Sequence, residues 1–93
     1  MGLEMTVILM EIEDVFSIEL PDECATLPRA GDFNARILLE LSKRDWTRKP
    51  GIPEPKWTEE EVWEELRLII SRTILIKSEK IAKETRFVED LGV

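Results

Sequence analysis

Hydrophobic residues recur at helical spacing over residues 3–16 of this chain. They stand three or four positions apart, which places them on one face of an α-helix; the members of this stripe are Met5, Ile8, Leu9, Ile12 and Phe16. The pattern predicts an amphipathic helix that packs its apolar face against a core. Pro21-Asp22 ends regular structure soon afterwards, and a brief third helix is expected through Glu23-Cys24-Ala25.

Two further stretches have the same period. The first runs from about residue 28 or 32 to residue 42, and the second from residue 58 to about residue 75. Their expected buried positions are Phe33, Ile37, Leu38 and Leu41 in the first and Val62, Leu66, Ile69, Ile70 and Thr73 in the second. The second has a well-defined start, because Thr58 and Glu61 have the spacing of a capping box and Trp57 can clamp on Val62.

The segments between the helices have different characters. Residues 43–57 contain Pro50, Gly51, Pro53 and Pro55 among charged side chains, so they cannot sustain a helix and are predicted to form a semi-rigid linker. Residues 76–87 read as an irregular connection, with Ile81 and Phe87 as apolar anchors.

Composition restricts the classes of partner. A chain of 93 residues makes one small domain, and its net charge of −7 disfavours nucleic acid and anionic membranes while favouring a basic protein surface. The single cysteine, Cys24, excludes an internal disulfide and is expected to be a small apolar filler, which suits a reducing, cytoplasmic location. No apolar run approaches the roughly 20 residues that span a bilayer.

The sequence lacks the residue types and motifs that are typical of catalytic sites. The chain has no histidine, the side chain most used as a general base near neutral pH and the commonest metal ligand. No phosphate loop, calcium loop or metal-ligand spacing is present. The sequence therefore predicts a protein that is not an enzyme and holds no metal.

The two ends of the chain resemble the two halves of one motif. Residues 87–93 read Phe-Val-Glu-Asp-Leu-Gly-Val and residues 1–7 read Met-Gly-Leu-Glu-Met-Thr-Val. Joined tail to head they are similar to the core signature of acyl carrier proteins, F-V-E-D-L-G-x-D-S-L, whose serine bears a 4′-phosphopantetheine arm. Ile18 to Glu23 and Arg29 to Phe33 resemble two further motifs of that family.

The resemblance implies an all-α, acyl-carrier-like four-helix bundle in circularly permuted order. Residues 1–42 would supply the family's second to fourth helices and residues 58–93 its first helix and long loop, with 43–57 as the linker. Gly2 then occupies the position of the phosphopantetheine serine, so the chain as written is expected to carry no cofactor. The implied role lies in fatty-acid, polyketide or related acyl-transfer pathways.

The family's second helix docks on basic surfaces of synthases and acyl-transfer enzymes. By register, the resemblance implies that the corresponding partner-binding residues of this chain are Glu4, Val7, Met10, Glu11, Glu13 and Asp14. Carboxylates around a small apolar patch can steer and dock a basic partner. Val7 departs from the pattern, because an acidic residue is common at its position.

Several alternatives stay open. The chain is a natural or engineered permutant, a slice of a tandem array, or a relative that binds partners without cargo. A different class of function is an acidic helical interaction module, and a different fold is an unrelated acidic three-helix bundle. A monomer is expected, with a domain-swapped dimer as the alternative at high concentration, because two complementary halves flank a proline-stiffened linker.

Overall fold

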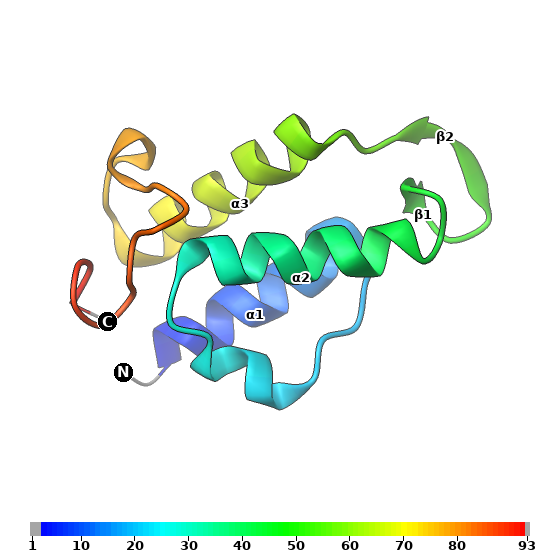
Figure 1. Cartoon of the computed structure of the whole chain (residues 1–93). Helices are drawn as coiled ribbons and strands as arrows, with labels where there is room; N and C mark the ends of the chain where they lie inside the picture. The colour runs from blue at the N-terminus through cyan, green and yellow to red at the C-terminus, as the bar shows by residue number, and fades with distance from the viewer. Residues whose placement is uncertain (1–2, 93) are drawn as a thin grey trace.

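The computed structural model describes residues 3–92 (Figure 1). Three α-helices pack around one core, a β-hairpin lies at one end, and the chain termini lie at the other. The elements in chain order are α1 (Leu3–Phe16), η1 (Asp22–Thr26), α2 (Ala30–Ser42), β1 (Thr47–Lys49), β2 (Ile52–Lys56), α3 (Glu59–Ile74) and η2 (Ser78–Lys80), where η denotes a 3₁₀-helix.

The predicted all-α four-helix bundle is wrong. The described residues form three α-helices and a two-stranded antiparallel sheet, so the fold is a mixed one. The brief third helix exists only as the five-residue 3₁₀-helix η1, in which the N–H of Cys24 donates to Pro21 O at 2.9 Å and that of Leu27 to Cys24 O at 3.1 Å. Prolines 21 and 28 bracket this segment and leave no room for an α-helix of ordinary length.

The segment that the sequence predicts to be a linker, residues 43–57, contains a β-hairpin. Thr47 pairs with Lys56 and Lys49 with Ile52 around a turn at Pro50-Gly51, where Gly51 takes a φ of 83° that glycine adopts without strain. The prolines of β2 exclude a helix, as the sequence predicts. They are compatible with an edge strand, in which some residues need not donate an N–H group to a neighbouring strand. Every residue of β2 is exposed, so the hairpin adds little to the core.

The helical stripes are buried largely as the sequence predicts. All five predicted positions of α1 are buried, and Ile8, Ile12 and Phe16 are fully so. The predicted core positions of α2 and α3 are confirmed at Phe33, Ile37, Leu41, Val62, Leu66, Ile69 and Ile70. Leu38 and Thr73 are only half-buried.

The start of α3 contains the predicted capping box. The N–H of Glu61 donates to Thr58 Oγ1 at 3.2 Å, and the N–H of Thr58 donates to Glu61 Oε1 at 3.1 Å. The hydrogen bond from the Thr58 backbone, assisted by the ion pair with Arg48, lowers the pKa of the Glu61 carboxyl below its ordinary value. The ionised form of Glu61 therefore stabilises the folded state.

Acidification should weaken this capping box. Because the folded-state pKa of Glu61 is depressed, its contribution is present above the unfolded pKa and is lost as the pH falls through the folded one, below about 4.5. We expect the free energy of urea unfolding to fall less between pH 7 and pH 3 in Glu61→Gln than in the unsubstituted chain. Glu60→Gln, on the same exposed turn, is the matched control, and equal pH dependence in all three proteins would contradict the prediction.

Residues 81–87 join the C-terminal half of the chain to α2. The N–H groups of Ala30 and Gly31 donate to Thr85 O at 3.0 Å and Lys83 O at 2.8 Å, and the N–H of Phe87 donates to Pro28 O at 3.0 Å. The Phe87 ring meets the edge of Phe33 at a centroid distance of 5.5 Å. Ile81 and Phe87 are both buried, which confirms their prediction as apolar anchors.

Candidate protein-docking site

The outward face of α1 combines carboxylates with exposed apolar side chains. Glu4 and Asp14 are exposed, as are Val7 at 42% and Met10 at 61% of their full area. This arrangement follows from the helical period, since burial of the stripe from Met5 to Phe16 turns these side chains to solvent. The helix contains four acidic residues and no basic one, so this face is strongly acidic.

Glu11 links α1 to α3. Its Oε2 lies 3.5 Å from the guanidinium of Arg72, an ion pair between side chains that both remain accessible to solvent. The pair sits beside the exposed residues of α1 and marks the boundary between the acidic helix and α3. Arg72 was not marked by the sequence as part of a site.

Glu13 takes part in the fold of the loop that follows α1. Its Oε2 accepts a hydrogen bond from the backbone N–H of Leu20 at 2.9 Å, and its carbonyl accepts one from Ile18 at 3.2 Å. The side chain is half-buried. Of the predicted docking residues, Glu4, Val7, Met10 and Asp14 are therefore the exposed ones without such an internal role.

Arg44 holds the C-terminal end of α1 in place. Its guanidinium donates to the carbonyls of Phe16 and Ser17, and also to those of Thr47 at 2.9 Å and Arg48 at 3.0 Å. Partial burial lowers the pKa of Arg44, which stays charged near neutral pH. No sequence motif marks this residue, because its partners are backbone carbonyls of two separate segments.

The head of α1 lies against the C-terminal segment. A small apolar pocket of about 180 Å³ is formed there by Met5, Ala25, Thr26, Leu27, Pro28, Phe87 and Val88. Gly2, the predicted position of the missing attachment serine, lies outside the described residues. Met5, in the first turn of α1, shares one pocket with Phe87 and Val88.

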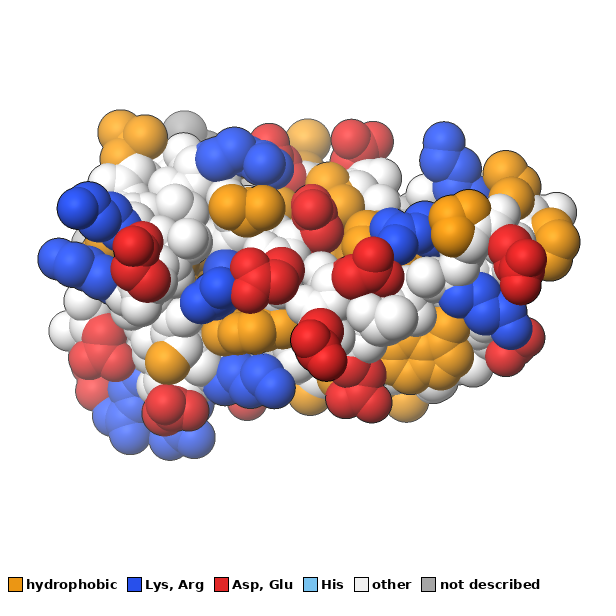
Figure 2. Space-filling view, turned by 90° about the horizontal axis from the view of Figure 1, so that it is seen from above, with side chains coloured by type: hydrophobic (Ala, Val, Ile, Leu, Met, Phe, Trp, Pro, Cys, Tyr) orange, Lys and Arg blue, Asp and Glu red, His pale blue; other side chains and the backbone are white. Residues whose placement is uncertain are grey.

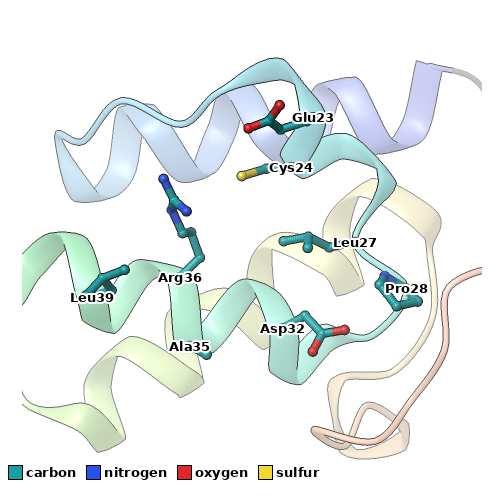
Figure 3. Close-up of a pocket in the computed structure, with 8 residues that line it drawn as sticks. All are labelled: Glu23, Cys24, Leu27, Pro28, Asp32, Ala35, Arg36 and Leu39. Carbon is teal, nitrogen blue, oxygen red and sulfur yellow. The ribbon is translucent and has the colours of Figure 1, made fainter.

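A larger open groove of about 690 Å³ lies between η1 and α2 (Figure 3). Cys24 and Arg36 stand on its facing walls, and Leu27 and Pro28 close one end. Burial raises the pKa of the Cys24 thiol, an effect that Arg36 opposes but does not overcome. The thiol is therefore protonated near neutral pH and is a poor nucleophile, in keeping with the filler role that the sequence suggests.

The exposed side of α3 carries apolar residues that the sequence pattern did not single out. Leu68 is 42% exposed and Leu75, directly after the helix, is 89% exposed. Leu68 and Arg72 are four residues apart and share one face of the helix, whereas Leu75 takes the left-handed conformation just beyond its last residue. Figure 2 looks onto the side of the molecule where α3 lies, and acidic, basic and apolar side chains are interspersed there.

Residues 3–92 contain no group of three or more acidic or cysteine side chains placed to hold a metal ion. In the same range, no helix is both long enough and apolar enough to cross a bilayer.

Comparison with known proteins gives no assignment. Neither the models of protein families, nor curated protein sequences, nor solved structures contain a match to this chain.

Proposed function

We propose that this chain is an acyl-carrier-like protein of fatty-acid, polyketide or related acyl-transfer pathways. As written it carries no arm of its own, because Gly2 stands where the family has its serine. The observation that supports the proposal is the shared pocket of Met5, Phe87 and Val88. It brings together segments that are more than 80 residues apart in the chain and that resemble the two halves of the carrier motif.

Partner choice follows from the charge of α1. The carboxylates of Glu4 and Asp14 attract a basic enzyme surface, and the exposed side chains of Val7 and Met10 supply the apolar contact once the partner has docked. The partners are thus the basic surfaces of synthases and transferases. A cytoplasmic location is part of the proposal, because the single cysteine is a buried free thiol.

The chemical test is incubation with a phosphopantetheinyl transferase and coenzyme A, followed by intact-mass measurement. We expect no mass gain, because no hydroxyl stands at Gly2. The serine hydroxyls of helices α2 and α3 already donate hydrogen bonds within the fold. The hydroxyl of Ser42 donates to Leu39 O at 2.7 Å, and that of Ser71 donates to Ile76 O. A gain of one arm by the unsubstituted chain would contradict the assignment of Gly2.

Restoring the attachment site should restore modification. A variant with Met1→Asp and Gly2→Ser, placed behind a new initiating methionine, is expected to gain the mass of one phosphopantetheine arm. The variant with Met1→Asp alone is the control. A folded double variant that stays unmodified would refute the carrier proposal and favour the second candidate, an acidic interaction module without cargo chemistry, for which the acidic face of α1 suffices.

Charge reversal on α1 should slow that modification. In the serine-restored chain, Glu4→Lys with Asp14→Lys is expected to lower kcat/KM of the transferase by about tenfold at low salt, because steering by the acidic face is lost. Glu54→Lys with Glu59→Lys makes the same change of net charge on β2 and at the first residue of α3, outside α1. Equal losses in the two double variants would show that only net charge matters and that α1 is not the docking face.

A further inference from the structure

The groove between η1 and α2 has the lining of a small-molecule site. Its apolar surface comes from Leu27 and Pro28, directly after η1, and from Ala35 and Leu39 on α2 (Figure 3). Leu39 is 49% exposed, so this surface is open to a ligand. The volume of about 690 Å³ falls within the roughly 300–1,000 Å³ of ligand pockets, which combine apolar walls with a few polar groups that fix the ligand.

Arg36 is the basic group of this groove, and its hydrogen-bonding capacity is largely unused. Its side chain extends from α2 into the space between the two elements, on the side where Cys24 lies (Figure 3). Its Nε is buried and donates no hydrogen bond within residues 3–92. Its one ion pair in that range is a contact of 3.5 Å with Glu40, whose carboxylate also pairs with Lys43 at 3.2 Å. A guanidinium in this state is suited to bind a carboxylate that enters the groove.

Glu23 supplies a negative charge on the other wall. Its carboxylate is exposed, lies next to Cys24 (Figure 3) and forms no ion pair in the part of the chain that the structure describes. Burial raises the pKa of the Cys24 thiol, Arg36 lowers that pKa and Glu23 raises it, so both charges lie close to the thiol. Asp32, the other carboxylate of the lining, already accepts a hydrogen bond from the N–H of Arg29 at 3.0 Å. Arg36 and Glu23 are therefore the two charges available to a ligand.

We propose that this groove binds a small α-amino acid with an apolar side chain. The carboxylate of the ligand pairs with Arg36, its ammonium group pairs with Glu23, and its side chain packs on Leu27 and Leu39. A plain monocarboxylate would be repelled by Glu23 and by the net charge of −7, and a plain amine would be repelled by Arg36. An apolar zwitterion matches both charges and the apolar walls.

This site is independent of the proposed carrier function, because neither Gly2 nor the outward face of α1 takes part in it. A ligand that bridges η1 and α2 binds only the folded chain, so it stabilises the fold by mass action. L-leucine at concentrations above its Kd should therefore raise the urea midpoint of the unsubstituted chain.

A titration followed by amide ¹H–¹⁵N NMR tests the proposal directly. We expect L-leucine to cause saturable shifts with a Kd of about 1 mM, concentrated at η1 and the middle of α2. Two analogues each lack one charge of leucine: 4-methylpentanoate has no ammonium group, and 3-methylbutylamine has no carboxylate. Each should bind about tenfold more weakly or less, because one of the two ion pairs is lost. Glycine, which lacks the apolar side chain, should also bind more weakly.

Substitutions in the groove provide the second arm of the test. Arg36→Gln and Glu23→Gln should each weaken leucine binding by about tenfold or more. Arg72→Gln is the matched control for the first, because Arg72 also lies 3.5 Å from a glutamate but does not line the groove. Glu60→Gln, on α3, is the control for the second. Glu23 is exposed, so its replacement leaves the fold intact and tests the site without a change in the core.

Three results would overturn the proposal. The first is the absence of leucine-dependent shifts up to the solubility limit of leucine. The second is binding of either single-charge analogue as tightly as leucine, which would show that the groove does not select a zwitterion. The third is equal leucine binding by the unsubstituted chain, Arg36→Gln and Glu23→Gln, which would place the ligand elsewhere on the molecule.

Discussion

Phe87→Ala is expected to remove a large share of the free energy of unfolding of the protein. The ring is 2% exposed and meets Phe33 edge to face at 5.5 Å, so its removal takes away a large apolar contact and leaves a cavity. Truncation of a buried phenylalanine typically costs about 3–5 kcal/mol, and small domains are stable by only about 5–15 kcal/mol. The cost should be near the upper value, because residues 81–87 also hold the two halves of the chain together.

Urea unfolding followed by far-ultraviolet circular dichroism measures this loss. Val88→Ala is the matched control, because the neighbouring Val88 is 61% exposed and lies on the rim of the same pocket. Its midpoint should move by little, since surface substitutions usually change stability by less than about 0.5 kcal/mol. A Phe87→Ala midpoint within the shift of Val88→Ala would show that Phe87 does not anchor the C-terminal segment.

The helices could be predicted because their signals are local. The bounds of α1 follow from the period of its apolar residues, and the start of α3 from Thr58, Glu61 and their reciprocal hydrogen bonds. Burial of these stripes then requires only that the helices pack together. The predictions were correct where one physical rule decided the structure within a window of a few residues.

The hairpin and η1 were mispredicted because two rules compete there. Proline excludes a helix in residues 50–55, but it does not distinguish an open linker from an edge strand beside a Pro-Gly turn. Pairing between Lys49 and Ile52 decides in favour of the strand. The resemblance to a four-helix family added a further bias, because it led us to expect an α-helix where η1 has only five residues.

The candidate site could be predicted only in part from the sequence. Contacts between elements decide which charged side chains are free to bind a partner. Register alone cannot reveal that Glu13 accepts from Leu20 N–H or that Glu11 pairs with Arg72. The left-handed conformation of Leu75 has no signature in the residue type, since leucine is uncommon there. Its exposure and strain became visible only when the end of α3 was located.

Gly31→Ala should destabilise the protein, although alanine is the better helix former. In an exposed helix interior this replacement usually gains up to about 1 kcal/mol. At Gly31, however, an added Cβ would lie 2.7 Å from the carbonyl oxygen of Lys83, a backbone atom that cannot rotate away. The same oxygen accepts the hydrogen bond from the N–H of Gly31 at 2.8 Å, so relief of the clash displaces residues 81–87 from α2.

We therefore expect a net loss of about 1–3 kcal/mol in the free energy of unfolding, the usual cost of overpacking. Ala35→Gly, at an exposed position of the same helix, measures the helix-propensity term alone and should cost up to about 1 kcal/mol. Hydrogen exchange adds a local readout: the amides of Ala30, Gly31 and Phe87 should lose protection in Gly31→Ala but keep it in Ala35→Gly. If Gly31→Ala were instead more stable than the unsubstituted chain, residues 81–87 would not pack against the start of α2 in solution, and the junction of the two halves would have to form elsewhere.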